Sequence, residues 1–210
     1  VEHMTRGPWV ISKVSKPFGR DAQMHDSSFG WRFVNPKMHE MYGTDGMGVT
    51  AENLVAQYGI SREDQDKFAY WSQMKASEAQ KNGRLAEEIV AVEIPQRKKD
   101  PIIFDQDEFI KPNTSLEILG KLRAAFKKEG GSVTAGNASG LNDGAVALLI
   151  AGEEAVKRNS FKPMARIVSA AVAGVEPRIM GIGPVYASEK ALKRAGLTID
   201  DMDIIEINEA

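Results

Sequence analysis

The spacing of apolar side chains predicts two consecutive helices early in the chain. Residues 50–56 form a short helical segment that Gly59 would end, because glycine readily leaves the helical conformation. Ser61 stands three residues before Asp64, where a serine hydroxyl can cap the first turn of a new helix. We expect this second helix to run to Gly83. Its outer side is expected to carry Lys67, Lys75 and Glu78, and its buried stripe Phe68, Trp71 and Ala79.

A strand and a third helix are predicted in the middle of the chain. Val90, Val92 and Ile94 alternate with less apolar neighbours, as in a half-buried strand. The segment 97–101 that follows contains three basic residues and is expected to form a solvated turn. The third helix is expected to end near Phe126, and the leucines that mark it are Leu116, Leu119 and Leu122.

The apolar pattern changes in the second part of the chain. The first roughly forty residues lack a period and are typical of a long structured excursion. From residue 132 onward, apolar runs of strand length occupy residues 145–151, 165–173 and 204–207, with a helical segment at residues 187–195. Apolar strands alternating with helices predict an α/β fold with a parallel or mixed sheet covered on both faces.

Composition narrows the classes of partner. The chain has 27 basic and 29 acidic residues, a formal charge of -2, and no apolar run long enough to span a bilayer, so we expect neither a nucleic-acid nor a membrane partner. It contains no cysteine, which excludes thiol nucleophiles and thiolate metal sites within this sequence. Three scattered histidines do not suggest a metal site either, and a cytoplasmic enzyme is expected.

Both ends of the sequence suggest an internal part of a longer folding unit. Position 1 is Val1, and the apolar segment 203–207 is followed only by Asn208, Glu209 and Ala210. A buried strand at a free terminus is uncommon. We therefore expect further sequence on both sides.

Three segments could carry chemistry. The loop 134–145 consists of small and short polar residues that let another molecule approach the backbone, although its polar side chains could equally satisfy local turns. Residues 180–187 open a helix with Pro184 in its first turn, where free amides can hold an anion or simply be capped. Asn208 and Glu209 follow an apolar run, where open α/β sheets place functional groups, or where a strand simply ends.

Taken together, these segments resemble the thiolase family. Five motifs occur in the family's order and span essentially the whole chain. They are residues 1–5 (the tail of GGVExMS), 48–53 (GxTAEN), 134–145 (TAGNASGxNDGA), 180–187 (MGxGPxxA) and 208–210 (the start of NEAFA). The amino-acid sequence of residues 31–36, 94–101 and 177–181 is most similar to that of the β-ketoadipyl-CoA thiolase branch of acetyl-CoA acyltransferases.

The resemblance implies a partial thiolase fold. Thiolases consist of two similar βαβαβαββ halves, with an α+β loop domain inserted in the first half. Residues 1–7 would then end a segment of the first half, and residues 8–133 would form the inserted, CoA-binding loop domain. Residues 134–158 would hold the last strand region of the first half, and residues 159–210 the start of the second.

The resemblance also implies a reaction. Thiolases cleave a 3-ketoacyl-CoA with free CoA, or run the reverse condensation, through an acyl-cysteine that a histidine and a second cysteine assist. The motifs of all three residues would lie outside this sequence, so the parent protein would be an acyltransferase and this segment alone inactive. Coenzyme A would be a co-substrate with no covalently bound cofactor, β-ketoadipyl-CoA a possible substrate, and a homo-dimer or homo-tetramer the assembly.

Site residues are carried over from the matching motifs. Asn208 is the single catalytic assignment, because the family's asparagine fixes a water in an oxyanion hole. Ser139 should meet the pantetheine arm of CoA. Lys111 stands where the family often has an arginine near the adenine and phosphates, although it could be an ordinary surface lysine. The complete predicted CoA-binding set is Ser139, Ala135, Ala138, Gly140, Phe126, Leu122, Lys111, Met47 and Met180.

Some features leave alternatives open. Gly46 precedes Met47 where many biosynthetic members have a histidine, which argues against an acetoacetyl-CoA synthase. A dicarboxylic acyl chain would need a cation near its far carboxylate, for which Arg178 or His39 are candidates. The alternative functions are a CoA-binding or subunit-association module without catalysis, and a lipid-transfer thiolase-like protein.

Overall fold

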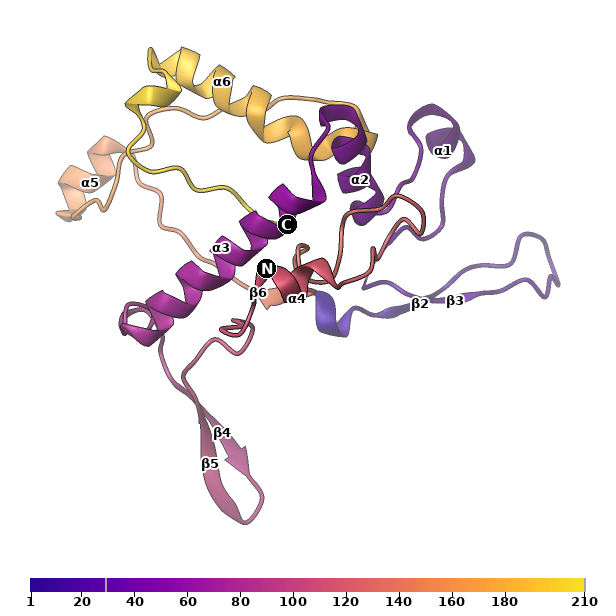
Figure 1. The fold of residues 1–210 in the computed structure, drawn as a ribbon, viewed down its shortest axis with the longest axis horizontal. Helices are drawn as coiled ribbons and strands as arrows, with labels where there is room; N and C mark the ends of the chain where they lie inside the picture. Colours follow the sequence, from indigo (N-terminus) through magenta and orange to yellow (C-terminus); the bar gives the residue numbers. More distant parts are fainter. Residues whose placement is uncertain (29, 210) are drawn as a thin grey trace. The chain divides into compact units, whose positions relative to one another are not determined.

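The computed structural model describes residues 1–28 and 30–209 (Figure 1). The chain divides into two compact units. The first unit comprises Val1–Leu54 and Ser139–Ala210, and the second unit comprises Val55–Ala138. Phe29 of the irregular N-terminal region and Ala210 of the last motif lie outside the described residues.

The N-terminal part of the first unit is built from short strands and one helix. Strand β1 (Glu2–His3) pairs antiparallel with β6 (Asp143–Gly144), which joins the two parts of this unit. Strands β2 (Trp9–Ile11) and β3 (Met24–Asp26) form an antiparallel hairpin. The remaining elements here are the 3-10 helix η1 (Met4–Arg6) and helix α1 (Pro36–Tyr42), which Asn35 caps.

Helix α6 (Gly183–Ala195) is the long helix of the C-terminal part of the first unit (Figure 1). It contains the predicted helical residues 187–195, and Pro184 lies in its first turn as predicted. Gly196 ends it with a φ of 70°, a conformation that favours glycine. The other elements of this part are α5 (Glu153–Asn159) and the 3-10 helices η3 (Pro177–Ile182) and η4 (Ile199–Asp201).

The two consecutive helices predicted early in the chain are confirmed as α2 (Met47–Tyr58) and α3 (Arg62–Lys81). Gly59 separates them with a φ of 64°. The side chain of Ser61 accepts a hydrogen bond from the backbone N–H of Asp64, so the predicted cap is present. Gly83, with a φ of 84°, lies just beyond the end of α3.

The rest of the second unit contains a hairpin and two short helices (Figure 1). Strand β4 (Val92–Gln96) starts two residues later than predicted, and β5 (Lys99–Phe104) includes part of the predicted basic turn. Helix α4 (Leu116–Gly120) is shorter than predicted, because the chain leaves the helix and Ala124 pairs with Thr134 in an isolated bridge. The other short element is the 3-10 helix η2 (Leu85–Glu87).

The predicted buried stripe of α3 is wrong at two of its three residues, and the third, Ala79, is half-buried. Phe68 is 54% exposed and Trp71 is 60% exposed, whereas Asp66 is buried at 4%. The helix packs onto α4 through the side that carries Asp66, because Arg62 and Asp66 bond to polar groups there. A hydrophobic pattern alone could not reveal that the buried contact is polar.

The predicted strands at residues 145–151, 165–173 and 204–207 are also absent from the part of the chain that the structure describes. Strands need hydrogen-bonding partners on a neighbouring strand, and no described segment pairs with these runs. Their apolar side chains are consequently exposed, as Val146 and Ile204 are at 79% and 87%. The described residues form three two-stranded antiparallel sheets, and the predicted parallel sheet is not among them.

Candidate functional site

A hollow of about 500 Å³ in the first unit is lined by residues from the start of α2 and from η3. Both methionines that the sequence assigned to the CoA site, Met47 and Met180, lie in its wall. Its volume is within the range of small-molecule sites, about 300–1,000 Å³. The other lining residues are Met4, Ser27, Ser28, Gly30, Trp31, Tyr42, Gly43, Thr44, Asp45, Gly46, Thr50, Pro177 and Arg178.

Asn53 of α2 links two residues that line this hollow, Asp45 and Arg178. Its side-chain amide donates to Asp45 Oδ2 at 2.9 Å and to the backbone oxygen of Arg178 at 3.0 Å. Gly181 lies against the same helix, because a Cβ atom there would be only 2.8 Å from Leu54 Cδ1. The GxTAEN and MGxGPxxA motifs, far apart in the sequence, therefore meet and form one wall.

Asp26 fixes another part of the lining. The Ser28 hydroxyl and the Ser28 N–H, which lies 2.8 Å from Asp26 Oδ1, hold the pKa of Asp26 below its ordinary value of 3.8. The charge of Arg32 acts in the same direction. Asp26 is therefore ionised at neutral pH and keeps Ser28 in place.

In the second unit, Asn137 anchors the first part of the small-residue loop. The backbone N–H of Thr134 donates to Asn137 Oδ1 at 2.7 Å, and Thr134 itself is fully buried. The Asn137 amide donates to Asp66 Oδ1 at 2.9 Å and to the Ser132 oxygen at 3.1 Å. This asparagine therefore ties the loop to α3 within the second unit.

Arg62 extends this anchor to α4. Its Nε lies 2.8 Å from Asp66 Oδ2, and its Nη2 donates to the backbone oxygens of Leu119 at 2.7 Å and Leu122 at 3.2 Å. The arginine thus satisfies carbonyl groups at the C-terminal end of a short helix. Because Asp66 is buried, removing either charge would leave the other poorly compensated.

Gly136 packs this loop closely against Leu119 of α4 and against Leu122, which follows that helix. A Cβ atom at this position would lie 2.5 Å from Leu122 Cδ1 and 2.6 Å from Leu119 Cδ2. Carbon atoms normally approach to about 3.5–4.0 Å, so only glycine fits without movement. The predicted wall residue Leu122 therefore contacts the small-residue loop.

Lys111 lies on a segment that glutamines hold against α3. The Lys111 N–H donates to Gln73 Oε1 at 2.7 Å, and Gln80 Nε2 donates to the Asp107 oxygen at 3.1 Å. The Lys111 ammonium donates to the Glu108 oxygen at 3.2 Å. Its backbone position is therefore fixed, while its charge lies at an exposed site.

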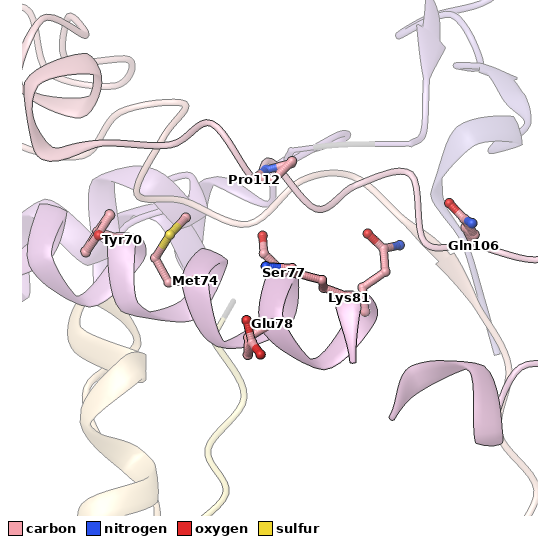
Figure 2. Close-up of a pocket in the computed structure, with 8 residues that line it drawn as sticks. Tyr70, Met74, Ser77, Glu78, Lys81, Gln106 and Pro112 are labelled. Atoms are coloured by element: carbon pink, nitrogen blue, oxygen red, sulfur yellow. The ribbon is translucent and has the colours of Figure 1, made fainter. Parts of the chain in front are cut away.

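A second hollow, of about 790 Å³, lies on α3 beside the segment that contains Pro112 (Figure 2). Figure 2 shows Tyr70, Met74 and Ser77 along the helix that forms one side of it. Among the atoms of the described residues, Ser77 Oγ is buried and lacks a hydrogen-bond partner. The other lining residues are Glu78, Gln80, Lys81 and Gln106.

The remaining predicted site residues do not line either hollow in the described part of the chain. Ser139 is exposed and Gly140 is half-buried, and Asn208 is exposed in a segment without regular secondary structure. In the second unit, Ala135 and Phe126 are exposed and Ala138 is half-buried. The catalytic role of Asn208 and the CoA contacts of the other residues stay predictions.

Several residues that build these sites were not found from the sequence. Arg62 and Asp66 have the spacing of a helical ion pair, which is a signal, but this spacing does not show that the pair is buried. Asn53 is the last residue of the GxTAEN motif, but the motif alone did not predict its hydrogen bonds. Gln73 gave no sequence signal.

Comparison with known proteins assigns the family. The model of "Thiolase, N-terminal domain" matches residues 1–154, and that of "Thiolase, C-terminal domain" matches residues 161–210. The chain belongs to the thiolase family. This confirms the resemblance drawn from the five motifs.

Named relatives match along the entire chain. The chain is 53% identical over 210 residues to a "Beta-ketoadipyl-CoA thiolase" of Acinetobacter baylyi. It is 52% identical over the same length to the "3-oxoadipyl-CoA/3-oxo-5,6-dehydrosuberyl-CoA thiolase" of Escherichia coli. All of this chain is covered in both comparisons, but only 52% of each relative. The chain thus spans about half the length of these relatives.

Solved structures of thiolases share the fold. The acetyl-CoA acetyltransferase of Bacillus anthracis is 40% identical with a TM-score of 0.83, and human mitochondrial 3-ketoacyl-CoA thiolase is 43% identical with a TM-score of 0.84. Each comparison covers 100% of this chain and 51% of the other. The α/β, partial thiolase-like fold class is therefore confirmed.

Two further observations concern membranes and metals. Across residues 1–28 and 30–209, no helix combines the length and the apolarity needed to cross a membrane. Within the same residues, no three His, Cys, Asp or Glu side chains gather as potential metal ligands.

Proposed function

We propose that this chain forms part of a thiolase that cleaves a 3-ketoacyl-CoA with CoA, with β-ketoadipyl-CoA as the substrate. The observation that carries the proposal is the 53% identity over the whole chain to a protein of that name. The hollow that contains Met47 and Met180 supports it, because an acyl chain needs an apolar site of this size.

The proposed reaction breaks one carbon–carbon bond. A cysteine thiolate attacks the 3-keto carbon, the bond between C2 and C3 breaks, and the two-carbon fragment leaves as the enolate of acetyl-CoA, which is then protonated. The acyl group passes from cysteine to the thiol of incoming CoA. The chain contains no cysteine, so both thiols of the family's mechanism would come from sequence outside residues 1–210.

Residues of this chain would bind and orient the substrate. The hollow around Met47 and Met180 would take the acyl part, and Ser139 with its small neighbours would take the pantetheine arm. Lys111 would attract the phosphates of CoA, since an ammonium binds phosphate as a point charge. Asn208 would hold a water that donates to the developing oxyanion. We further propose a homo-dimer or homo-tetramer.

The test is thiolysis by the full-length gene product with CoA and 3-oxoadipyl-CoA, which is another name for β-ketoadipyl-CoA. Cleavage between C2 and C3 must yield acetyl-CoA and succinyl-CoA in equal amounts, which chromatography of the CoA esters measures. Acetoacetyl-CoA serves as the comparison substrate. Cleavage of acetoacetyl-CoA alone would retain the thiolase proposal and refute the β-ketoadipyl assignment, and cleavage of neither would refute both.

A second candidate is a CoA-binding or subunit-association module without catalysis. The absence of cysteine from the chain favours it for the 210 residues by themselves. Calorimetric titration of CoA into the 210-residue protein tests this second candidate. Saturable binding of CoA to these 210 residues, with no cleavage of a 3-ketoacyl-CoA by the full-length gene product, would favour the module, and no saturable binding would refute it.

A further inference from the structure

Charge in the hollow of the first unit is confined to two side chains. Among its described lining residues, Arg178 is the one cation and Asp45 the one anion. The other lining residues are small, aromatic, hydroxyl-bearing or thioether groups. Arg178 is therefore the cationic residue that the described lining offers to an acyl chain in this hollow.

Asn53 fixes both charged residues. Its amide group donates to Asp45 Oδ2 and to the backbone oxygen of Arg178, so Arg178 is held at its main chain while the Asp45 carboxylate already accepts a hydrogen bond. A ligand carboxylate would be repelled by Asp45 and attracted by Arg178. An anionic end of an acyl chain in this hollow would therefore be favoured near Arg178 and disfavoured near Asp45.

The guanidinium is oriented by a carboxylate of its own chain. Arg178 Nε lies 3.0 Å from Glu176 Oε2, and Glu176 is not among the described lining residues. A guanidinium carries five N–H donors in a planar fork, so it can bond to more than one partner at the same time. Arg178 lies two residues before Met180 on η3, beside the proposed acyl site.

We propose that Arg178 binds the terminal carboxylate of a dicarboxylic 3-ketoacyl chain and sets the preference of the enzyme for such substrates. This inference rests on the proposed thiolase function. Both relatives described above are named for acyl groups, adipyl and suberyl, whose chains end in a second carboxylate. His39, the other cation considered from the sequence, is not among the described lining residues.

The test compares two substrates that differ only at the far end of the chain. The full-length gene product is assayed with 3-oxoadipyl-CoA and with 3-oxohexanoyl-CoA, which has the same six carbons but no second carboxylate. In Arg178→Met, the ratio of kcat/KM for the first substrate to that for the second should fall about tenfold, the effect of a charge-assisted hydrogen bond at a half-exposed site. Arg178→Lys, which keeps the charge, should retain part of the ratio.

Controls separate this role from a general loss of structure. Measurable turnover of 3-oxohexanoyl-CoA shows that Arg178→Met is folded, and His39→Gln should leave the ratio at its original value. An unchanged ratio in Arg178→Met would overturn the inference while leaving the thiolase proposal intact. If the unaltered protein cleaves neither substrate, the proposed function fails and the inference fails with it.

Discussion

Replacing Gly136 by alanine tests whether the small-residue loop is packed as closely as the structure indicates. The added Cβ would lie 2.5 Å from Leu122 Cδ1 and 2.6 Å from Leu119 Cδ2, at least about 1 Å inside normal carbon–carbon contact. Both atoms end flexible side chains, but Leu119 is only 3% exposed, and Arg62 binds the backbone oxygens of both leucines. Neither leucine can therefore move away freely.

The expected cost follows from this geometry. Overpacking of a well-packed site typically costs about 1–3 kcal/mol. Alanine restricts the unfolded chain more than glycine does, which offsets about 0.4–1 kcal/mol of this. We expect Gly136→Ala to lose about 1–2 kcal/mol of local stability, which corresponds to roughly 5- to 30-fold more opening.

Hydrogen–deuterium exchange of the full-length gene product measures this opening directly. The useful probe is the Ala125 amide, which donates to the Val133 oxygen at 2.9 Å in the same packed region. Gly120→Ala is the matched control, because a Cβ at Gly120 meets nothing within 4 Å in the described structure. It should leave exchange unchanged or slow it slightly. Equal exchange rates in the two variants would refute the packing argument.

Three other predictions concern side chains that the structure singles out. Asp66→Asn removes the partner of Arg62 and should destabilise the protein by about 3 kcal/mol in urea unfolding, and a loss below about 1 kcal/mol would contradict a buried pair. Ser77→Ala removes a buried hydroxyl without a partner and should raise stability by about 0.5–1 kcal/mol in the same assay. A loss of stability would show instead that this hydroxyl makes a hydrogen bond. The Thr5 hydroxyl and N–H lower the pKa of Asp143 in the folded protein. The ionised Asp143 carboxylate therefore stabilises the fold fully above its ordinary pKa of 3.8, and this stabilisation is lost as the pH falls through the lowered pKa. An acid titration of Asp143→Asn should lack this part of the pH dependence, and an unchanged titration would contradict the assignment.

Local signals along the sequence predicted α2, α3 and α6, but not α1 or α5. Ser61, Gly59 and Gly83 act through groups within a few residues of themselves, so their spacing was sufficient to place the ends of helices. The family resemblance likewise assigned Met47 and Met180 to one site, and both line one hollow.

Features that depend on distant partners were not predictable from the sequence. The buried side of α3 is polar because Asp66 meets Asn137, 71 residues further along the chain. The apolar runs at residues 145–151, 165–173 and 204–207 have strand composition, but a strand also requires a neighbour, and the described residues supply none. Of the two candidate cations, only geometry separates Arg178, which lines the hollow, from His39.

Acylation of the full-length gene product tests the proposed thiolase chemistry most directly. The protein is incubated with 3-oxoadipyl-CoA in the absence of free CoA, digested, and analysed by peptide mass spectrometry. Because residues 1–210 contain no cysteine, we expect one succinyl group on a cysteine outside this sequence, and its loss when CoA is added. Cleavage of the substrate without such an adduct, or an adduct that CoA removes from a residue of this chain, would contradict the account.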